Sequence, residues 1–312
     1  MSKKVLLAGL ALVLVVASLV GCTPAPAELK KVTMVTDQGG VDDKSFNQAA
    51  WDGLEKFGDA NKSEVKVDYV ESNSEQDYAP NLTAAVGQGA GLVWGVGYMM
   101  ATQLDEAAKN NPNVQFGIVD SAPADPDAAL PNVAYVVFKE NEGSFLVGLI
   151  AGLTTKTNNV GFVGGMSGGV IEKFEVGFHA GVKAANPDAT VQIQYAEDWG
   201  AIAKGEQIAT TMINNGADVV YHAAGGTGIG VAQACDKAKV HFIGVDVDQS
   251  DLTPYTLTSM LKRLDTAIYT ISDDWLKGKF EGKKIHSLGL AEDGVGYVYD
   301  PEKISDEVKA VV

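Results

Sequence analysis

Polar and aromatic side chains gather near the start of the chain, in the segment 36–54, TDQGGVDDKSFNQAAWDGL. Asp37 ends a run of β-branched and apolar residues, and Phe46 and Asn47 follow a glycine turn. From Phe46 onward apolar residues recur at helical spacing, so the segment predicts a strand, a turn and a helix N-terminus. Ligands meet parallel α/β folds at junctions of this kind. The segment is therefore a candidate binding site.

The acids of this segment limit what it can bind. Asp42 and Asp43 stand directly before the predicted helix, whose N-terminus favours an anion that the acids would repel. Neither a P-loop lysine nor a Gly-x-Gly-x-x-Gly pattern is present. Asp43 or Ser45 is expected to cap the helix. The segment does not suit a phosphate.

Further candidate residues follow later predicted strands. Asp120 and Asp246 each end a strand, and a carboxylate at the C-terminal end of a strand faces the ligand side of such sheets. For Asp120 a turn cap is the alternative, and for Phe174 core packing is as plausible as ligand contact. Gly226 belongs to a glycine cluster that offers backbone N–H groups at a helix start. Lys262 follows a strand too, and carboxylates paired with an ammonium group suit hydroxyls and ring heteroatoms.

The sequence carries no enzyme signature. Its four histidines are scattered without metal-ligand spacing, and its two cysteines, Cys22 and Cys235, form no paired-thiol motif. A Gly-x-Ser-x-Gly elbow is also missing. We therefore expect a binding protein without catalytic residues, cofactor or metal.

The first residues resemble an export signal. Lys3 and Lys4 precede an uncharged run that is too short to span a membrane. The run ends in Leu-Val-Gly-Cys, which looks like a bacterial lipobox, so 1–21 is predicted to be a lipoprotein signal peptide and Cys22 the lipidation site. Residues 22–30 would form a tether at the cell membrane, on its extracytoplasmic side. The formal net charge of −16 argues against nucleic acid as a partner.

Short apolar runs alternate with amphipathic segments over most of the chain, which predicts an α/β fold with two doubly wound parallel sheets. Three crossings between the sheets would make both domains discontinuous and leave a ligand cleft between them. The first lobe is expected to hold 31–138 and about 263–284, the second 139–262 and about 285–312. The second crossing would precede a helix at 261–277. The strands are expected near 32–36, 65–70, 91–96, 114–119, 160–164, 190–195, 218–221 and 241–245.

Four runs resemble the basic membrane protein family of bacterial lipoproteins, which includes the purine nucleoside receptor type. They are VTDQGGVDDKSFNQAAWDGL, GFVGGMSGGVIEKFEVGFHAG, GADVVYHAAGGTGIGV, and FIGVDVDQ followed by LTSMLKRLDTA. The resemblance implies the type I periplasmic binding protein fold, with a hinge between the lobes. It also implies a monomeric ligand-capturing component of an ABC importer, with a membrane permease as its partner. One departure is that the chain stops sooner after Ser305 than such proteins usually do.

Site roles follow from the resemblance, residue by residue. In the nucleoside-binding branch two aromatic rings hold the base, while acids and a lysine bind the ribose and the base edge. Phe46 and Phe174 would be the stacking pair. Asp246 would accept from the ribose hydroxyls, and Lys262 would donate from the hinge side. Asn47 and Asp120 would form hydrogen bonds with the base or the sugar. The assignments of Asp37 and Gly226 as ligand residues rest on nearby motif matches only.

Other ligands and roles stay open. Members of the family also take a flavin, so riboflavin or a sugar is the alternative ligand. A surface sensor or interaction lipoprotein of the same fold is an alternative role. A nucleoside hydrolase or phosphorylase is disfavoured because no nucleophile is placed for it.

Overall fold

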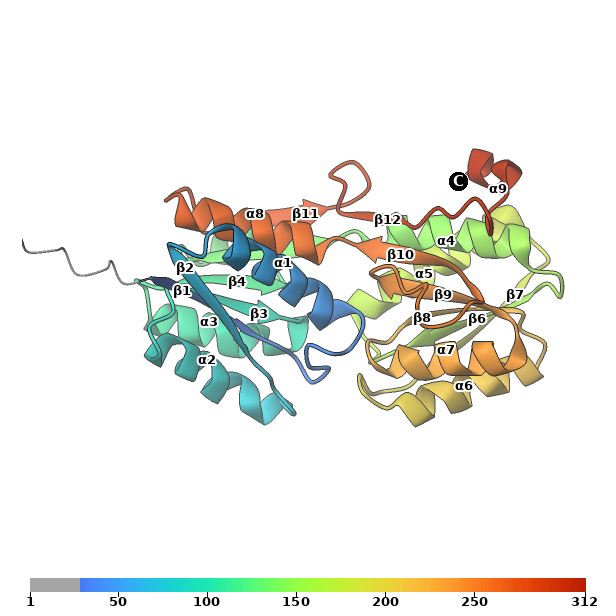
Figure 1. Ribbon diagram of the computed structural model, residues 1–312, viewed down its shortest axis with the longest axis horizontal. Coiled ribbons are helices and arrows are strands. Elements are labelled where there is room, and N and C mark those ends of the chain that lie inside the picture. The colour runs from blue at the N-terminus through green and yellow to red at the C-terminus, as the bar shows by residue number, and fades with distance from the viewer. Residues whose placement is uncertain (1–28) are drawn as a thin grey trace, which may run out of the picture.

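The computed structural model describes residues 29–312, which form two lobes side by side, each built around a six-stranded sheet (Figure 1). The predicted signal peptide 1–21, the lipidation site Cys22 and most of the tether lie outside the described residues. Within 29–312 no helix is both long and apolar enough to cross a membrane. The predicted α/β class with two parallel-sheet domains is confirmed, apart from one antiparallel edge strand in the second sheet.

The first lobe holds a parallel sheet in the order β2-β1-β3-β4-β5-β11. Helices α1 and α8 cover one face of this sheet, and α2 and α3 cover the other (Figure 1). Its elements are β1 (Lys30–Val35), α1 (Phe46–Ala60), β2 (Val65–Val70), α2 (Tyr78–Gly87), β3 (Leu92–Val96), α3 (Ala101–Asn110), β4 (Gln115–Val119), β5 (Val133–Phe138), α8 (Leu264–Leu276) and β11 (Ile285–Leu288).

The second lobe repeats the arrangement in the order β7-β6-β8-β9-β10-β12, with β12 antiparallel to β10. Helices α4 and α5 lie on one face of the sheet, and α6 and α7 on the other (Figure 1). Its elements are α4 (Glu140–Thr154), β6 (Asn159–Gly164), α5 (Gly169–Ala185), β7 (Thr190–Tyr195), α6 (Ile202–Asn214), β8 (Val219–Ala223), α7 (Thr227–Ala238), β9 (His241–Asp246), β10 (Thr256–Lys262), β12 (Val295–Tyr297) and α9 (Asp306–Val311).

The chain crosses between the lobes three times. The first crossing leads from β5 into α4 and the second from β10 into α8, each through a single residue, Lys139 and Arg263. The third lies between β11 and β12. These three crossing segments form the hinge between the two lobes.

One predicted domain boundary and one predicted helix start differ from the structure. The second lobe was expected to begin again at about 285, but Ile285–Leu288 form β11 and pair in register with Tyr135–Phe138 of the first sheet. A short apolar run does not reveal which sheet edge it will join. The domain boundary predicted from the sequence therefore falls one strand too early. Residues 261 and 262 belong to β10, and α8 starts only at Leu264.

Glycines let paired helices approach to backbone contact. A Cβ on Gly181 of α5 would lie 2.1 Å from the carbonyl oxygen of Phe145 in α4. On Gly53 of α1 it would lie 2.3 Å from the carbonyl of Asp265 in α8. Because α4 and α8 both follow hinge strands, this close packing fixes the hinge to the body of each lobe.

Candidate functional site

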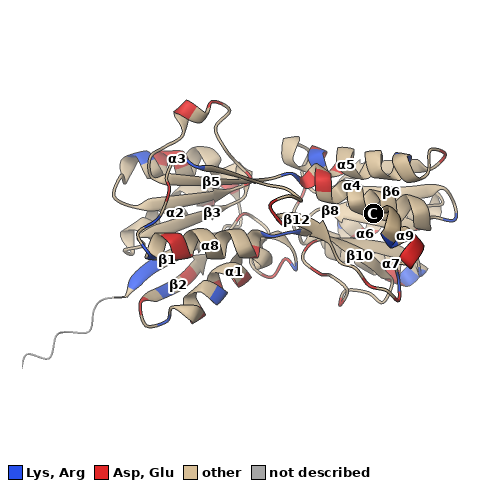
Figure 2. Ribbon diagram, turned by 90° about the horizontal axis from the view of Figure 1, so that it is seen from above, with Lys and Arg blue, Asp and Glu red and all other residues tan. Residues whose placement is uncertain are grey.

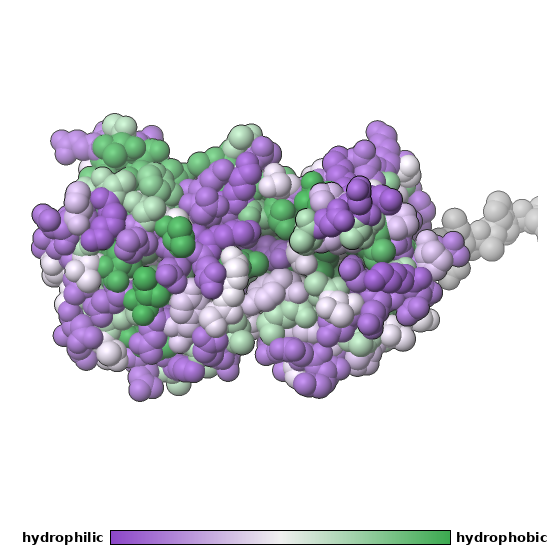
Figure 3. All heavy atoms as spheres, turned by 180° about the vertical axis from the view of Figure 1, so that it is seen from behind, coloured by the Kyte–Doolittle hydropathy of each residue, from purple (hydrophilic) through white to green (hydrophobic). Residues whose placement is uncertain are grey.

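A cavity lies between the lobes, at the carboxyl ends of the strands of both sheets. The empty space between its lining residues, counted out to its open mouth, is about 520 Å³. Figure 3 shows the narrow waist between the two lobes from the back of the molecule. The cavity is lined by Asp37, Gly39, Asp43, Phe46, Asn47, Gly97, Tyr98, Asp120, Val170, Ile171, Phe174, Trp199, Ala223, Ala224, Gly225, Val245, Asp246 and Lys262.

Strand ends place the charged groups of the cavity. Asp120 directly follows β4 and Asp246 is the last residue of β9, so one aspartate comes from each lobe. Both have left-handed backbone, with φ of 64° and 67°. Aspartate adopts this region more readily than most residues, and strained backbone of this kind concentrates at functional sites. The turn at each strand end brings the two carboxylates to the cavity.

Asn47 joins two carboxylates of the first lobe. Its Nδ2 donates to Asp37 Oδ1 at 2.7 Å and to Asp43 Oδ2 at 3.1 Å, while its Oδ1 accepts from the backbone N–H of Asp37 at 3.3 Å. Asp43 also accepts from the backbone N–H groups of Ser45 and Gln48. It therefore caps α1, as expected of Asp43 or Ser45.

Lys262 is a buried ammonium group among carboxylates. Its Nζ lies 2.6 Å from Asp120 Oδ2 in the first lobe and 3.1 Å from Glu140 Oε1. Glu140 is 1% exposed and also pairs with Lys173 at 3.1 Å. Burial lowers the pKa of Lys262, but the attraction of Asp120, Glu140 and Asp246 outweighs it and raises that pKa above its usual value. Lys262 therefore stays charged at neutral pH.

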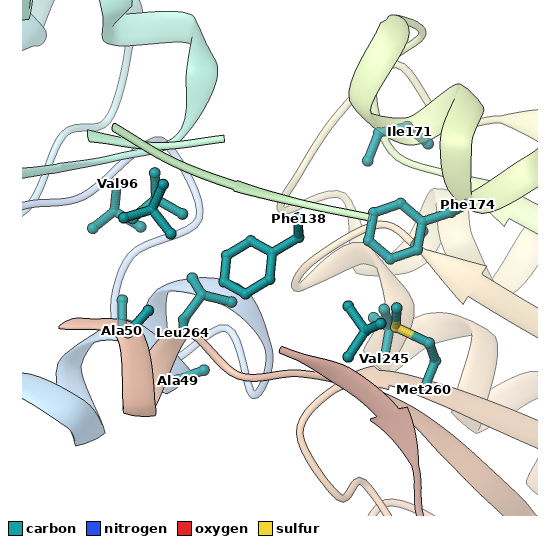
Figure 4. Close-up of a cluster of buried hydrophobic side chains, with 14 of the residues drawn as sticks. Ala49, Ala50, Val96, Phe138, Ile171, Phe174, Val245, Met260 and Leu264 are labelled. Carbon is teal, nitrogen blue, oxygen red and sulfur yellow. The ribbon is translucent and has the colours of Figure 1, made fainter. Parts of the chain in front are cut away.

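Aromatic rings surround this ammonium group. Lys262 Nζ lies 5.0 Å from the ring centre of Phe46, 5.1 Å from Phe138 and 5.4 Å from Phe174. These distances are within cation–π range. Figure 4 shows Phe138 and Phe174 in the region between the lobes, with Val245 and Met260 close by. A cation and an apolar wall thus share one end of the cavity.

Burial makes the cavity carboxylates weak acids. It raises the pKa of Asp37 to about 6, of Asp120 to about 6 and of Asp246 to about 7. For Asp120 and Asp246 the attraction of Lys262 opposes the rise. Near neutral pH, ionisation of these buried carboxyl groups costs free energy. A hydrogen-bond donor from a ligand would reduce this cost.

Several carboxylate oxygens have no partner within the described chain. Asp120 Oδ1 is buried without a hydrogen bond. Among residues 29–312, no hydrogen bond uses Asp37 Oδ2 or Asp246 Oδ1 either. Buried acceptors need donors. The arrangement therefore favours a ligand that is rich in hydroxyl or N–H groups and flat enough for an aromatic wall.

Figure 2 shows basic and acidic residues scattered over both lobes rather than gathered in one basic face. Within the described part of the chain, no group of histidine, cysteine and acidic residues has the arrangement of a metal site.

Seven of the eight predicted ligand residues line the cavity: Asp37, Phe46, Asn47, Asp120, Phe174, Asp246 and Lys262. Gly226 does not, whereas its neighbour Gly225 does. A Cβ on Gly226 would instead approach the carbonyl oxygen of Trp199, at 3.3 Å. The glycine cluster therefore reaches the cavity, but its spacing in the sequence does not indicate which glycine faces inward.

Sequence reasoning missed several residues of the site. Tyr98 and Trp199 line the cavity from loops after β3 and β7, and Glu140 holds Lys262 from the first turn of α4. Tyr98 follows a Trp-Gly-Val-Gly strand end, a signal that could have indicated it. Trp199 and Glu140 have no local signal, because only the folded lobes bring them to the cavity.

Comparisons with known proteins agree with this architecture. Residues 30–311 match the family described as ABC transporter substrate-binding protein PnrA-like. The chain is 48% identical over 301 residues to the CD4+ T-cell-stimulating antigen of Listeria innocua serovar 6a, covering 90% of this chain and 83% of that protein. It is 40% identical over 302 residues to the ABC transporter nucleoside-binding protein BmpA of Lactococcus lactis subsp. cremoris, covering 90% and 84%.

A solved structure is also similar. The crystal structure of an ABC transporter solute-binding protein from Aeropyrum pernix K1 superimposes with a TM-score of 0.81 at 29% identity, covering 90% of this chain and 80% of that one. The fold is therefore that of type I periplasmic binding proteins. The chain belongs to the family of PnrA-like substrate-binding proteins of ABC transporters, which bind a small solute for a partner permease and do not transform it.

Proposed function

We propose that this protein binds purine nucleosides, namely adenosine, guanosine or inosine, in the cavity between its lobes. The observation that carries the proposal is the combination of Phe46 and Phe174 with Asp120, Asp246 and Lys262 around a single cavity. Such a set matches a flat base joined to a hydroxyl-rich sugar. The nucleoside-binding name of the Lactococcus lactis relative supports the same ligand class.

The aromatic residues would hold the base. Phe46 is half-buried and Phe174 is 3% exposed, so a base between their rings would leave water almost completely. Each aromatic pair contributes about 0.5–1.5 kcal/mol beyond the area that it buries. Asp37, which Asn47 holds in place, offers its remaining oxygen to an N–H group of the base.

The charged residues would hold the ribose. Asp246 would accept from the ribose hydroxyls, and Lys262 would donate from the hinge side. Hydrogen bonds to a charged group contribute about 1.5–3 kcal/mol each. A phosphate in place of a ribose hydroxyl would meet Asp120 and Asp246, so nucleotides would be rejected.

We further propose that Cys22 carries lipid and anchors the protein at the extracytoplasmic side of the cell membrane. The Leu-Val-Gly-Cys sequence supports this anchor. Lobe closure around the nucleoside would present a closed surface to the permease. Mass spectrometry of the intact purified protein tests the anchor, because acylation at Cys22 adds a defined mass that Cys22→Ala abolishes.

Mass spectrometry of ligand released from denatured protein tests the proposed ligand. We expect a purine nucleoside, which absorbs only in the ultraviolet. A flavin, which absorbs in the visible, or a sugar would overturn the proposal and assign the cavity to another branch of the family.

A further inference from the structure

Two of the hydrogen bonds between the lobes come from residues beside the cavity rather than from its lining. Ser45 Oγ of the first lobe donates to Asp246 Oδ2 of the second at 2.5 Å, and Gln249 Nε2 of the second lobe donates to the carbonyl oxygen of Lys44 at 2.8 Å. Neither Lys44, Ser45 nor Gln249 lines the cavity. We call these two bonds the latch.

The second lobe holds Gln249 in one orientation. Its Oε1 accepts from the backbone N–H of Val245 at 3.0 Å and contacts His222 Nε2 at 2.9 Å, and its backbone N–H donates to Ser259 Oγ at 3.0 Å. Burial lowers the pKa of His222 to about 4, so the ring is neutral and its Nε2 carries the proton for Gln249. With Oε1 held by two donors of its own lobe, the amide nitrogen is left to face the first lobe.

The first lobe also fixes its two latch residues, Lys44 and Ser45, in position. Lys44 has left-handed backbone, with φ of 57°. The carboxylate of Asp43 accepts from the backbone N–H of Ser45 at 2.9 Å, and Ser45 is completely buried. Two preformed surfaces therefore meet at this point, so little conformational entropy is lost when the latch forms.

We propose that Gln249 and Ser45 are positioning residues that keep the lobes closed and so set how long a ligand stays bound, without touching it. Both bonds join different lobes, so both must break when the cavity opens. A hydrogen bond of this kind changes an equilibrium by about tenfold. Because Asp246 also lines the cavity, the bond from Ser45 links closure to a group that faces the ligand.

Two variants test the latch in the full-length protein. Gln249→Glu keeps the oxygen that accepts from Val245 and His222, and replaces the donor to Lys44 with a charged carboxylate oxygen that repels that carbonyl. Ser45→Ala removes the donor to Asp246. For each we expect adenosine to dissociate about tenfold faster, with its association rate changed less than about threefold. Gln207→Glu, the same change on the exposed side of α6, is the control and should match the wild type.

A second measurement needs no ligand. In the ligand-free variants, backbone hydrogen exchange should be faster in segments 43–48 and 97–100, which face the second lobe, and unchanged in the core strand β8. The measurement of adenosine dissociation, by stopped flow, rests on the proposed nucleoside binding. The measurement of hydrogen exchange does not. If wild-type protein binds no nucleoside, the proposed function fails and exchange alone decides the latch. Dissociation within twofold of wild type, or unchanged exchange in both segments, would overturn the latch.

Discussion

The buried carboxylate of Asp246 is expected to lower the free energy of unfolding and to strengthen ligand binding. The variant Asp246→Asn separates these two effects. Burial, opposed by Lys262 and Ser45, raises the pKa of this carboxyl from 3.8 to about 7. The folded state therefore binds the proton more tightly than the unfolded chain does. The penalty for ionisation is absent below the unfolded pKa, grows between about 4 and 7, and is complete above the folded pKa.

The size of the effect follows from that shift. About three pKa units at 1.36 kcal/mol each give a penalty of about 4 kcal/mol at pH 8, and the same linkage gives about 2 kcal/mol at pH 5. Asparagine keeps the shape and an oxygen for Ser45 but has no charge. Asp246→Asn should therefore raise the free energy of unfolding, and raise it more at pH 8 than at pH 5.

Urea denaturation followed by circular dichroism at both pH values measures this difference. Calorimetry on the same variant should show nucleoside binding weakened by about 10- to 100-fold, because a charge-assisted bond to the ribose is lost. Asp248→Asn, an exposed neighbour, is the control and should change neither quantity. A variant that is less stable than wild type at pH 8, or equally stabilised at both pH values, would refute the reasoning.

Three further predictions concern packing, charge and stacking. Gly181→Ala should lower the free energy of unfolding by about 1–3 kcal/mol, because its Cβ would meet the carbonyl of Phe145 in α4. Lys262→Met should lower it by about 3–5 kcal/mol, because buried carboxylates lose their partner. Phe174→Leu keeps an apolar wall but loses the buried ring, so adenosine should bind about 2- to 10-fold more weakly, and the free energy of unfolding should fall by about 1 kcal/mol.

Each of these has its own check. Gly87→Ala in α2, where an added Cβ meets no atom within 4 Å, should be neutral or stabilising in the same urea titration as Gly181→Ala. For Lys262→Met, stability equal to wild type at pH 8 would contradict the ion-pair account. If Phe174→Leu binds adenosine as tightly as wild type by calorimetry, the ring does not stack on the base.

The first strand–turn–helix shows how far the sequence could lead. Strand β1, the start of helix α1 and the cavity positions of Phe46 and Asn47 follow from residues 32–54, because one local pattern specifies the strand end and the helix start together. The role of Ser45 does not. Asp43 or Ser45 was expected to cap the helix, and Asp43 does so; the hydroxyl of Ser45 instead donates across the lobes to Asp246, a partner 201 residues away.

Long-range pairing explains the other differences. Glu140 is the first residue of α4, and its sequence neighbourhood reads as an ordinary helix start; only the meeting of two hinge strands brings it to Lys262. In the same way β11 consists of four residues, too few for periodicity to show which sheet it extends. Local patterns predict elements and strand-end chemistry, but not contacts between segments that are distant in the sequence.

Calorimetric titration of folded, ligand-free protein with adenosine, guanosine and inosine tests the central claim most directly. The site predicts dissociation constants that are micromolar or tighter for at least one of the three, and no binding of the corresponding monophosphate. Absence of binding for all three nucleosides, in protein shown to be folded and empty, would contradict the claim.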